Sequence, residues 1–236
     1  MNKNIILILC CFFSLRLEGF VLITSLYNEL NEKRACEYIK CLEYNQNHPL
    51  IDYIIVFYDS SKKGNSFILQ ELKKRDIEVI DTKIKPLFSS LFRRANQFPY
   101  NTKIIIANAD IYFNTTLSLL ENYSLEGKIL ALTRWNDDGK GSLSLYEWPQ
   151  PKEGDGSQDA WIFKVPCIIK GINRISLGSR FCDSQLVSMA RSMGYRVENP
   201  CFSIQICHLH NVEIRHYLKQ KVIMPTEFES CQWSFL

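Results

Sequence analysis

Residues 103–114 read Lys-Ile-Ile-Ile-Ala-Asn-Ala-Asp-Ile-Tyr-Phe-Asn. The apolar run from Ile104 to Ala107, followed at once by polar residues, is typical of a strand that is buried on both faces. Asn108 and Asp110 are two residues apart, so in an extended chain their side chains point to the same side. Ligands of open α/β sheets bind at the carboxyl ends of the strands. The stretch therefore predicts a buried strand that ends in a pair suited to a cation or a sugar, or in an ordinary turn.

Apolar strands and amphipathic helices alternate on both sides of this stretch. Strands are expected at residues 20–25, 51–58, 78–81, 128–133, 159–164, 195–197 and 202–207, and helices at 31–45, 67–74, 87–97, 116–122 and 184–193. This order predicts an α/β fold with a largely parallel sheet and right-handed crossovers. Residues 136–157, which contain several glycines and prolines, are expected to form one long loop. Trp135 and Trp148 beside it suit either stacking on a sugar or anchoring of the loop.

The first predicted helix has a clear start and a clear buried face. Asn31 is a favoured N-cap residue. Apolar residues from Ala35 to Leu42 recur at helical spacing, which predicts that this face packs against the sheet. Because Arg34 and Glu37 are charged, we expect them on the exposed side.

The composition fits one folded domain, which we expect over residues 20–236. The chain has 236 residues, 46% of them hydrophobic, and its net charge is only +3. No long basic run is present, so nucleic-acid binding has no electrostatic support. Seven cysteines follow residue 19 without a Cys-x-x-Cys pair, which argues against a structural zinc site.

Residues 1–19 differ from the rest of the chain. Lys3 precedes the apolar run from Ile5 to Phe13, as in a secretory signal peptide or a short membrane anchor. A confident membrane span needs about 20 apolar residues. We therefore expect a location in the secretory lumen or at a membrane, with membrane association through residues 5–15. A merely apolar N-terminus is the alternative.

Four segments together resemble the glycosyltransferases of family two, which have the GT-A fold and transfer a sugar from a nucleotide-diphosphate donor. Residues 25–29, Ser-Leu-Tyr-Asn-Glu, resemble the Pro-x-Tyr-Asn-Glu loop of that family, and residues 59–65 resemble its Asp-Gly-Ser-Thr-Asp-Gly-Thr loop. Residues 108–110 resemble its Asp-x-Asp motif, with Asn first. Residues 182–183, Cys-Asp, precede a helix that ends in Gly-Tyr at 194–195, as in its Glu-Asp helix, with Cys for Glu.

The resemblance implies a fold, a set of ligands and a donor site. The fold would be a GT-A-like three-layer sandwich around a mostly parallel sheet, with a Rossmann-like nucleotide-binding half. The nucleotide sugar would bind to five residues on the strand ends: Tyr27, Glu29, Asp59, Asn108 and Asp110. The acceptor would be a glycan or a lipid-linked hydroxyl compound, and the enzyme a hexosyltransferase or a related transferase.

The resemblance also implies a metal and a catalytic base. A divalent cation, Mn or Mg, would bind Asp110 and a histidine near the end of the fold. His208 and His210 are the candidates because they follow a predicted strand directly, and we prefer His208. Asp183 would be the base of an inverting reaction, and Asp159 is the alternative base. Asp183 at the start of a helix also suits N-capping.

Two other functions compete with this interpretation. Asn108 and Cys182 depart from the family pattern, which favours a catalytically inactive GT-A-like protein that binds a glycan or a partner. A nucleotidyltransferase on a related sheet is less favoured, because the chain has no glycine-rich phosphate loop.

Overall fold

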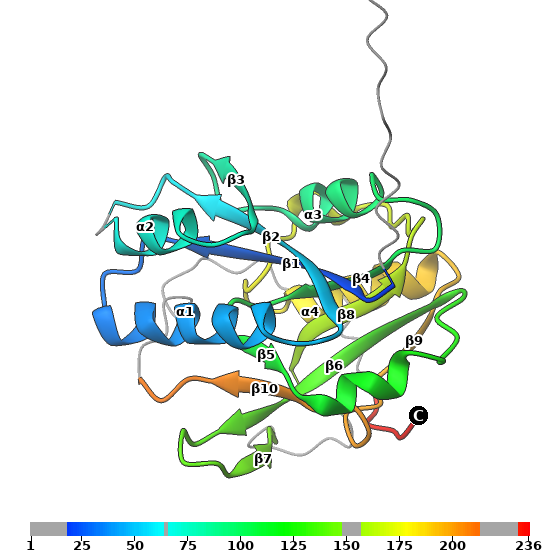
Figure 1. Ribbon diagram of the computed structural model, residues 1–236. Helices are drawn as coiled ribbons and strands as arrows, with labels where there is room; N and C mark the ends of the chain where they lie inside the picture. The colour runs from blue at the N-terminus through cyan, green and yellow to red at the C-terminus, as the bar shows by residue number, and fades with distance from the viewer. Residues whose placement is uncertain (1–17, 64–65, 148–156, 213–230) are drawn as a thin grey trace, which may run out of the picture.

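The computed structural model describes residues 18–63, 66–147, 157–212 and 231–236 (Figure 1). The strands are β1 (Phe20–Tyr27), β2 (Ile51–Asp59), β3 (Glu78–Thr82), β4 (Lys103–Ala107), β5 (Ile111–Phe113), β6 (Lys128–Asp137), β7 (Leu143–Leu145), β8 (Gln158–Lys164), β9 (Arg196–Glu198) and β10 (Ile206–Leu209). The α-helices are α1 (Glu32–Gln46), α2 (Phe67–Lys73), α3 (Phe88–Ala95) and α4 (Cys182–Ser192). Two 3₁₀ helices are η1 (Thr115–Leu120) and η2 (Ile172–Arg174).

The strands form one mixed sheet in the order β3-β2-β1-β4-β8-β6-β10-β5. Strands β3, β2, β1 and β4 are parallel, and β10 and β9 run parallel to β6. Strand β8 is antiparallel to both β4 and β6, and it joins the two parallel parts. The α/β class and the mostly parallel sheet are therefore as predicted.

Two apolar cores lie on opposite faces of the sheet. In β1, Leu22 packs in the core under α1, α2 and η1, whereas Val21 and Ile23 pack in the core under α3 and α4. Alternate residues of one strand are thus buried on opposite faces, which explains its nearly continuous apolar sequence. The result is a three-layer arrangement, with α1 and α2 over one face and α3 and α4 over the other (Figure 1).

The expected long loop is partly a hairpin. Strand β6 continues to Asp137 because β10 pairs with its second half, and β7 then pairs back onto β6. Trp135 donates its indole N–H to the carbonyl of Cys201 at 2.9 Å, so it anchors this strand. Trp148 and its neighbours up to residue 156 lie outside the described residues.

Residues 1–17 of the predicted leader also lie outside them, as do Gly64 and Asn65 of the loop after β2. Among the described helices, none combines the length and apolar character that a membrane span needs. The seven cysteines after the leader are free thiols in the structure.

Candidate functional site

The site is built around the turn between β4 and β5. The amide N–H of Ile111 donates to the carbonyl of Asn108 at 3.1 Å, which closes the turn. Asp110 then lies at the start of β5, and its carbonyl accepts the amide of Leu209 in β10 at 3.0 Å. The turn thus brings Asp110 beside a strand that is distant in sequence.

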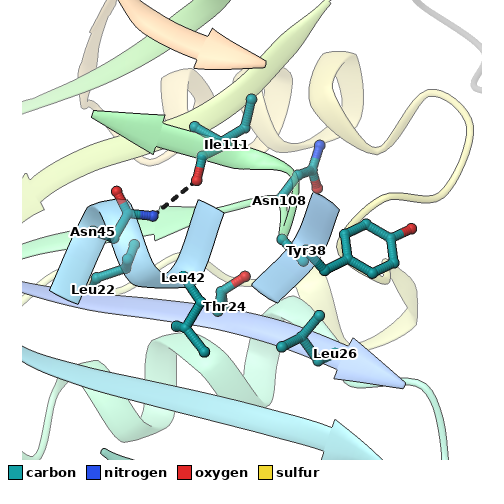
Figure 2. A pocket seen from close by; sticks show the side chains of 9 residues that line it. Leu22, Thr24, Leu26, Tyr38, Leu42, Asn45, Asn108 and Ile111 are labelled. Atoms are coloured by element: carbon teal, nitrogen blue, oxygen red, sulfur yellow. Dashed lines mark hydrogen bonds between the residues drawn. The ribbon is translucent and has the colours of Figure 1, made fainter. Parts of the chain in front are cut away.

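A small cavity lies behind this turn, between β1 and α1 (Figure 2). It is lined mainly by apolar side chains and has room for about one water molecule. Asn45 at one side donates to the carbonyl of Ile111 at 2.9 Å and accepts the amide of Phe113 at 3.0 Å. A cavity of this size excludes a sugar.

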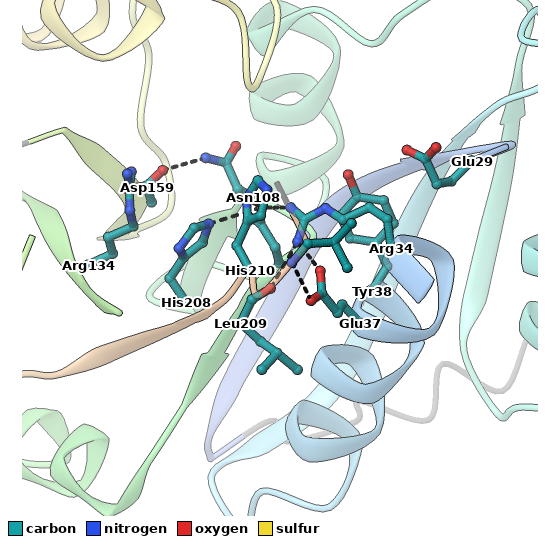
Figure 3. A network of polar contacts seen from close by, with 12 residues as sticks. Glu29, Arg34, Glu37, Tyr38, Asn108, Arg134, Asp159, His208, Leu209 and His210 are labelled. Atoms are coloured by element: carbon teal, nitrogen blue, oxygen red, sulfur yellow. Dashed lines mark hydrogen bonds and ion pairs between the residues drawn. The ribbon is translucent and has the colours of Figure 1, made fainter. Parts of the chain in front are cut away.

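Asp110 contacts two histidines, His208 and His210, and Figure 3 labels both rings. Its Oδ2 atom lies 3.1 Å from Nε2 of His208 and 3.9 Å from Nδ1 of His210. The two histidines are two residues apart, so both rings lie on the same side of the chain. The sequence suggested one histidine ligand, and the structure brings both to the carboxylate.

The placement of His208 differs from the prediction. We expected it to follow a strand at 202–207, but the strand is Ile206–Leu209 and contains His208. Residues 202–205 form turns, which are closed by hydrogen bonds that the amide N–H groups of Ser203 and Ile204 donate to the carbonyl of Pro200. Pairing with both β5 and β6 therefore fixes the backbone of His208, and His210 lies beyond the end of the strand.

These three side chains fit a divalent cation. They offer one oxygen and two nitrogen atoms within 4.8 Å of one another. Metal bonds of about 2.1 Å place neighbouring ligand atoms about 3 to 4 Å apart. Two imidazoles beside one carboxylate suit a transition-metal ion better than Mg, which prefers oxygen ligands.

The electrostatics of the cluster favour the ionised form of Asp110. Burial opposes ionisation of Asp110, but His208, Arg34 and His210 outweigh it and hold the pKa of Asp110 well below its ordinary value. Burial and the nearby Arg34 lower the pKa of His210, which favours the neutral form of its ring. An ionised carboxylate and a neutral imidazole are the forms that bind metal.

Asn108 and Asp159 form a second polar group beside the first. The amide of Asn108 donates to Oδ1 of Asp159 at 2.8 Å, and Nη1 of Arg134 donates to Oδ2 at 2.8 Å (Figure 3). Asp159 is buried, and both of its oxygen atoms are engaged. The Asn in place of the first acid of the motif is therefore matched to its surroundings, because an amide can donate to this carboxylate and a second carboxylate cannot.

Asp183 differs from both groups. It lies in the first turn of α4, but the N-cap residue is Phe181, which has a left-handed backbone (φ 61°) and no side-chain capping bond. N-capping by Asp183 is therefore wrong; its carboxylate accepts the amide of its neighbour Ser184 at 3.0 Å. Burial raises the pKa of Asp183, and repulsion by Asp159 adds to this rise.

Cys182 is a neutral thiol beside this carboxylate. It is buried, and burial together with the charge of Asp183 raises the pKa of the thiol to about 12. A protonated thiol is a poor nucleophile and a poor metal ligand. Cys182 therefore replaces the acid of the motif by an uncharged, packed side chain.

The other residues that were predicted to bind the sugar donor lie at the neighbouring strand ends, where they make local hydrogen bonds. Glu29 accepts the amide of Asn31 at 2.9 Å and the hydroxyl of Tyr27 at 3.1 Å, just before α1. Asp59, at the end of β2, is buried and accepts both the amide and the hydroxyl of Ser61. These residues shape the loops at the sheet edge on the Asp110 side.

Sequence reasoning missed two arginines of the site. Arg34 was expected on the exposed side of α1, but only 2% of it is exposed and it pairs with Asp110. Arg34 lies four residues before Tyr38, at the edge of the apolar face of the helix, and this position could have indicated its burial. Arg134 was not assigned a role, although it follows an apolar run directly, as Asp159 precedes one.

Structural comparisons show the fold. A mannosyltransferase from Pyrobaculum calidifontis, solved with GDP-Man and Mn2+, superposes with a TM-score of 0.51 at 12% identity, over 84% of this chain and 58% of that one. TarS of S. aureus, residues 1–349 with UDP-GlcNAc, superposes with a TM-score of 0.53 at 17% identity, over 86% and 62%. A 4-diphosphocytidyl-2C-methyl-D-erythritol synthase gives a TM-score of 0.48 at 14% identity, over 77% and 88%.

The fold is thus GT-A-like, with a Rossmann-like nucleotide-binding half, as the motifs suggested. The chain spans about three fifths of the length of the two glycosyltransferase structures. Compared by sequence, it matches no protein-family model and no curated protein. Membership of glycosyltransferase family two therefore stays a prediction.

Proposed function

We propose that the protein is a glycosyltransferase that takes a sugar from a nucleotide-diphosphate donor and uses one divalent cation. The observation that carries this proposal is the cluster of Asp110, His208 and His210 on the edge of a GT-A-like sheet. Ligand sites of such sheets lie at the carboxyl ends of the strands. Two solved proteins of this fold are described with GDP-Man and UDP-GlcNAc, which supports a nucleotide sugar as the donor.

The cation would supply the charge that the leaving group needs. Departure of a nucleoside diphosphate builds negative charge, which a divalent ion stabilises. Asp110, His208 and His210 would hold the ion, and Mn fits this set better than Mg. Tyr27, Glu29 and Asp59 would shape the part of the edge that receives the nucleoside.

Asp183 is the better candidate for the base. A base needs an oxygen atom that can accept a proton, and both oxygen atoms of Asp159 already accept hydrogen bonds. The raised pKa of Asp183 makes it a stronger proton acceptor than an ordinary aspartate. In a single displacement, the acceptor oxygen would bond to the anomeric carbon of the donor as the bond from that carbon to the diphosphate breaks, and its proton would pass to Asp183, with inversion at that carbon. Asp159 would position Asn108 and the donor.

The test is a screen for donor hydrolysis. The full chain is incubated with GDP-mannose, UDP-GlcNAc and other nucleotide sugars, with Mn²⁺ or with a chelator, and release of free nucleotide diphosphate is measured. We expect Mn-dependent release from at least one donor, and loss of that release in Asp110→Asn. Release that persists in Asp110→Asn would contradict the assignment of this carboxylate.

The inactive alternative has a structural observation in its favour, besides Asn108 and Cys182. Arg34 already supplies a positive charge to Asp110, as expected of a protein that has lost its cation. Nucleotide binding without any hydrolysis or transfer, with or without Mn²⁺, would favour this alternative. A secretory-lumen or membrane-anchored location, in which residues 5–15 contact the membrane, is proposed for either function.

A further inference from the structure

The cluster of Asp110, His208 and His210 is tied to helix α1 by two charged residues. Arg34 is 2% exposed, and its Nη2 atom pairs with Oδ2 of Asp110. Its Nη1 atom donates to the carbonyl of Leu209 at 2.9 Å, between the two histidines, and to Oε2 of Glu37 at 2.6 Å. Arg34 therefore contacts two chain segments that supply the cluster.

Glu37 contacts the chain on the far side of His210. Its Oε1 atom accepts the amide of Asn211 at 2.8 Å and that of Val212 at 3.2 Å. Its other carboxylate oxygen, Oε2, accepts a hydrogen bond from Arg34. His210 is thus bracketed, because the carbonyl before it is held by Arg34 and the amide after it is held by Glu37 (Figure 3).

The bracket matters because strand pairing does not reach His210. His208 pairs with Ile111 of β5 and with Asn136 of β6, so the sheet itself places His208 next to Asp110. Strand β10 ends at Leu209, and His210 follows that end. A ring whose backbone has left the sheet needs another support if it is to stay beside the carboxylate.

We propose that Arg34 and Glu37 form a clamp on α1 that positions His210 and Asp110 for one divalent cation. The clamp residues are positioning residues: they hold the ligand-bearing chain and do not bind the cation. Glu37 partly offsets the positive charge that Arg34 brings to Asp110. This inference rests on the metal site of the proposed function.

Binding of Mn²⁺ alone to the full chain tests the clamp, measured by the electron paramagnetic resonance signal of free Mn²⁺. Loss of a side chain that hydrogen-bonds to a metal ligand typically lowers metal affinity about 10- to 100-fold. We expect a loss of this size in Arg34→Lys, which keeps the charge but not the fork of donors. Glu37→Gln should lower the Mn²⁺ affinity about tenfold, because its single side-chain oxygen cannot accept the hydrogen bonds of both Arg34 and the amides. Glu71→Gln is the matched control, since Glu71 lies on α2 and pairs with Lys74 and Arg75. The Mn²⁺ affinity of this variant should equal that of the wild type.

A double-mutant cycle separates positioning from charge. If Glu37 acts through His210, Glu37→Gln should cost little in a His210→Ala background. A purely electrostatic effect of Glu37 would persist there in full, and that result would overturn the clamp. Unfolding temperatures of the metal-free variants show whether each one is folded.

The imidazole NMR signals of the metal-free protein give a second readout. The signals of His210 should shift in Arg34→Lys and Glu37→Gln, and stay in place in Glu71→Gln. Wild-type affinity in Glu37→Gln together with unshifted signals would reject the clamp and leave the metal site standing. Absence of Mn²⁺ binding in the wild type would reject the metal site and the clamp with it.

Discussion

Asp110 and Asp183 are two partly buried carboxylates of the same site in opposite electrostatic surroundings. Asp110 faces Arg34, His208 and His210, and these groups hold its pKa well below the ordinary value. Asp183 accepts backbone amides, faces the carboxylate of Asp159, and has a raised pKa because of burial and that repulsion. Environments that separate the pKa values of neighbouring acids commonly mark different chemical roles. On this basis we propose that Asp110 binds the cation and that Asp183 takes the proton.

The largest effect should come from Asp183→Asn. An amide cannot take the proton of the acceptor, so the turnover number should fall about 10²- to 10⁴-fold. Mn²⁺ affinity should stay at the wild-type value, because Asp110 and its histidines are untouched. Steady-state transfer assays and Mn²⁺ titrations measure the two quantities. Turnover near the wild-type level would contradict the different roles proposed for the two carboxylates.

Arg134→Met should have the largest effect on stability. It removes the cation that faces Asp159, whose side chain is only 7% exposed. Breaking a buried ion pair by removing one partner costs about 3–5 kcal/mol. Urea unfolding measures this loss, and Arg94→Met is the control, since Arg94 pairs with Glu78 at a more exposed site. An equal loss in the two variants would show that Asp159 does not depend on Arg134.

Asn108→Asp should have a smaller effect of the same sign. It restores the acid of the Asp-x-Asp motif, but it replaces the donor to Asp159 by a second carboxylate. Loss of that hydrogen bond in a buried site costs about 1–3 kcal/mol. Stability should therefore fall at pH 7 and recover at low pH, where one of the two acids is protonated. Higher stability or tighter Mn²⁺ binding in this variant would show that Asn108 is a defect of the site.

The smallest effect should be the pH dependence of stability that Asp183 itself contributes. Its pKa is higher in the folded than in the unfolded chain, so its contribution is complete below the unfolded pKa and is lost as the pH rises through the folded pKa. The Asp183→Asn variant lacks this pH-dependent loss of stability. Its unfolding temperature, relative to the wild type, should therefore increase from pH 4 to pH 8. A relative unfolding temperature that decreases over this range would contradict the raised pKa.

Most of the fold could be predicted because its signals are local. The apolar runs of β1, β2 and β4 and the N-cap Asn31 are visible in short windows of sequence, and Asn31 does cap α1. The extension of β6 to Asp137 depends on pairing with β10, about 70 residues later, so no local pattern predicts it.

The site was predictable only in its carboxylates and histidines. Carboxylates and histidines at strand ends are recognisable candidates because ligands of such sheets bind there, whereas arginine is usually exposed. Arg34 is buried because Asp110, Leu209 and Glu37 satisfy its donors, and two of these partners arrive from distant segments. The sequence shows the residue but not the partners that make its burial possible.

Calorimetric titration of GDP and UDP, with and without Mn²⁺, tests the central claim most directly. We predict that at least one of the two binds the full chain, with at least tenfold higher affinity in the presence of Mn²⁺, and that Asp110→Asn removes this gain. Absence of binding in all conditions, or an affinity that Mn²⁺ does not change, would contradict a metal-dependent donor site at Asp110.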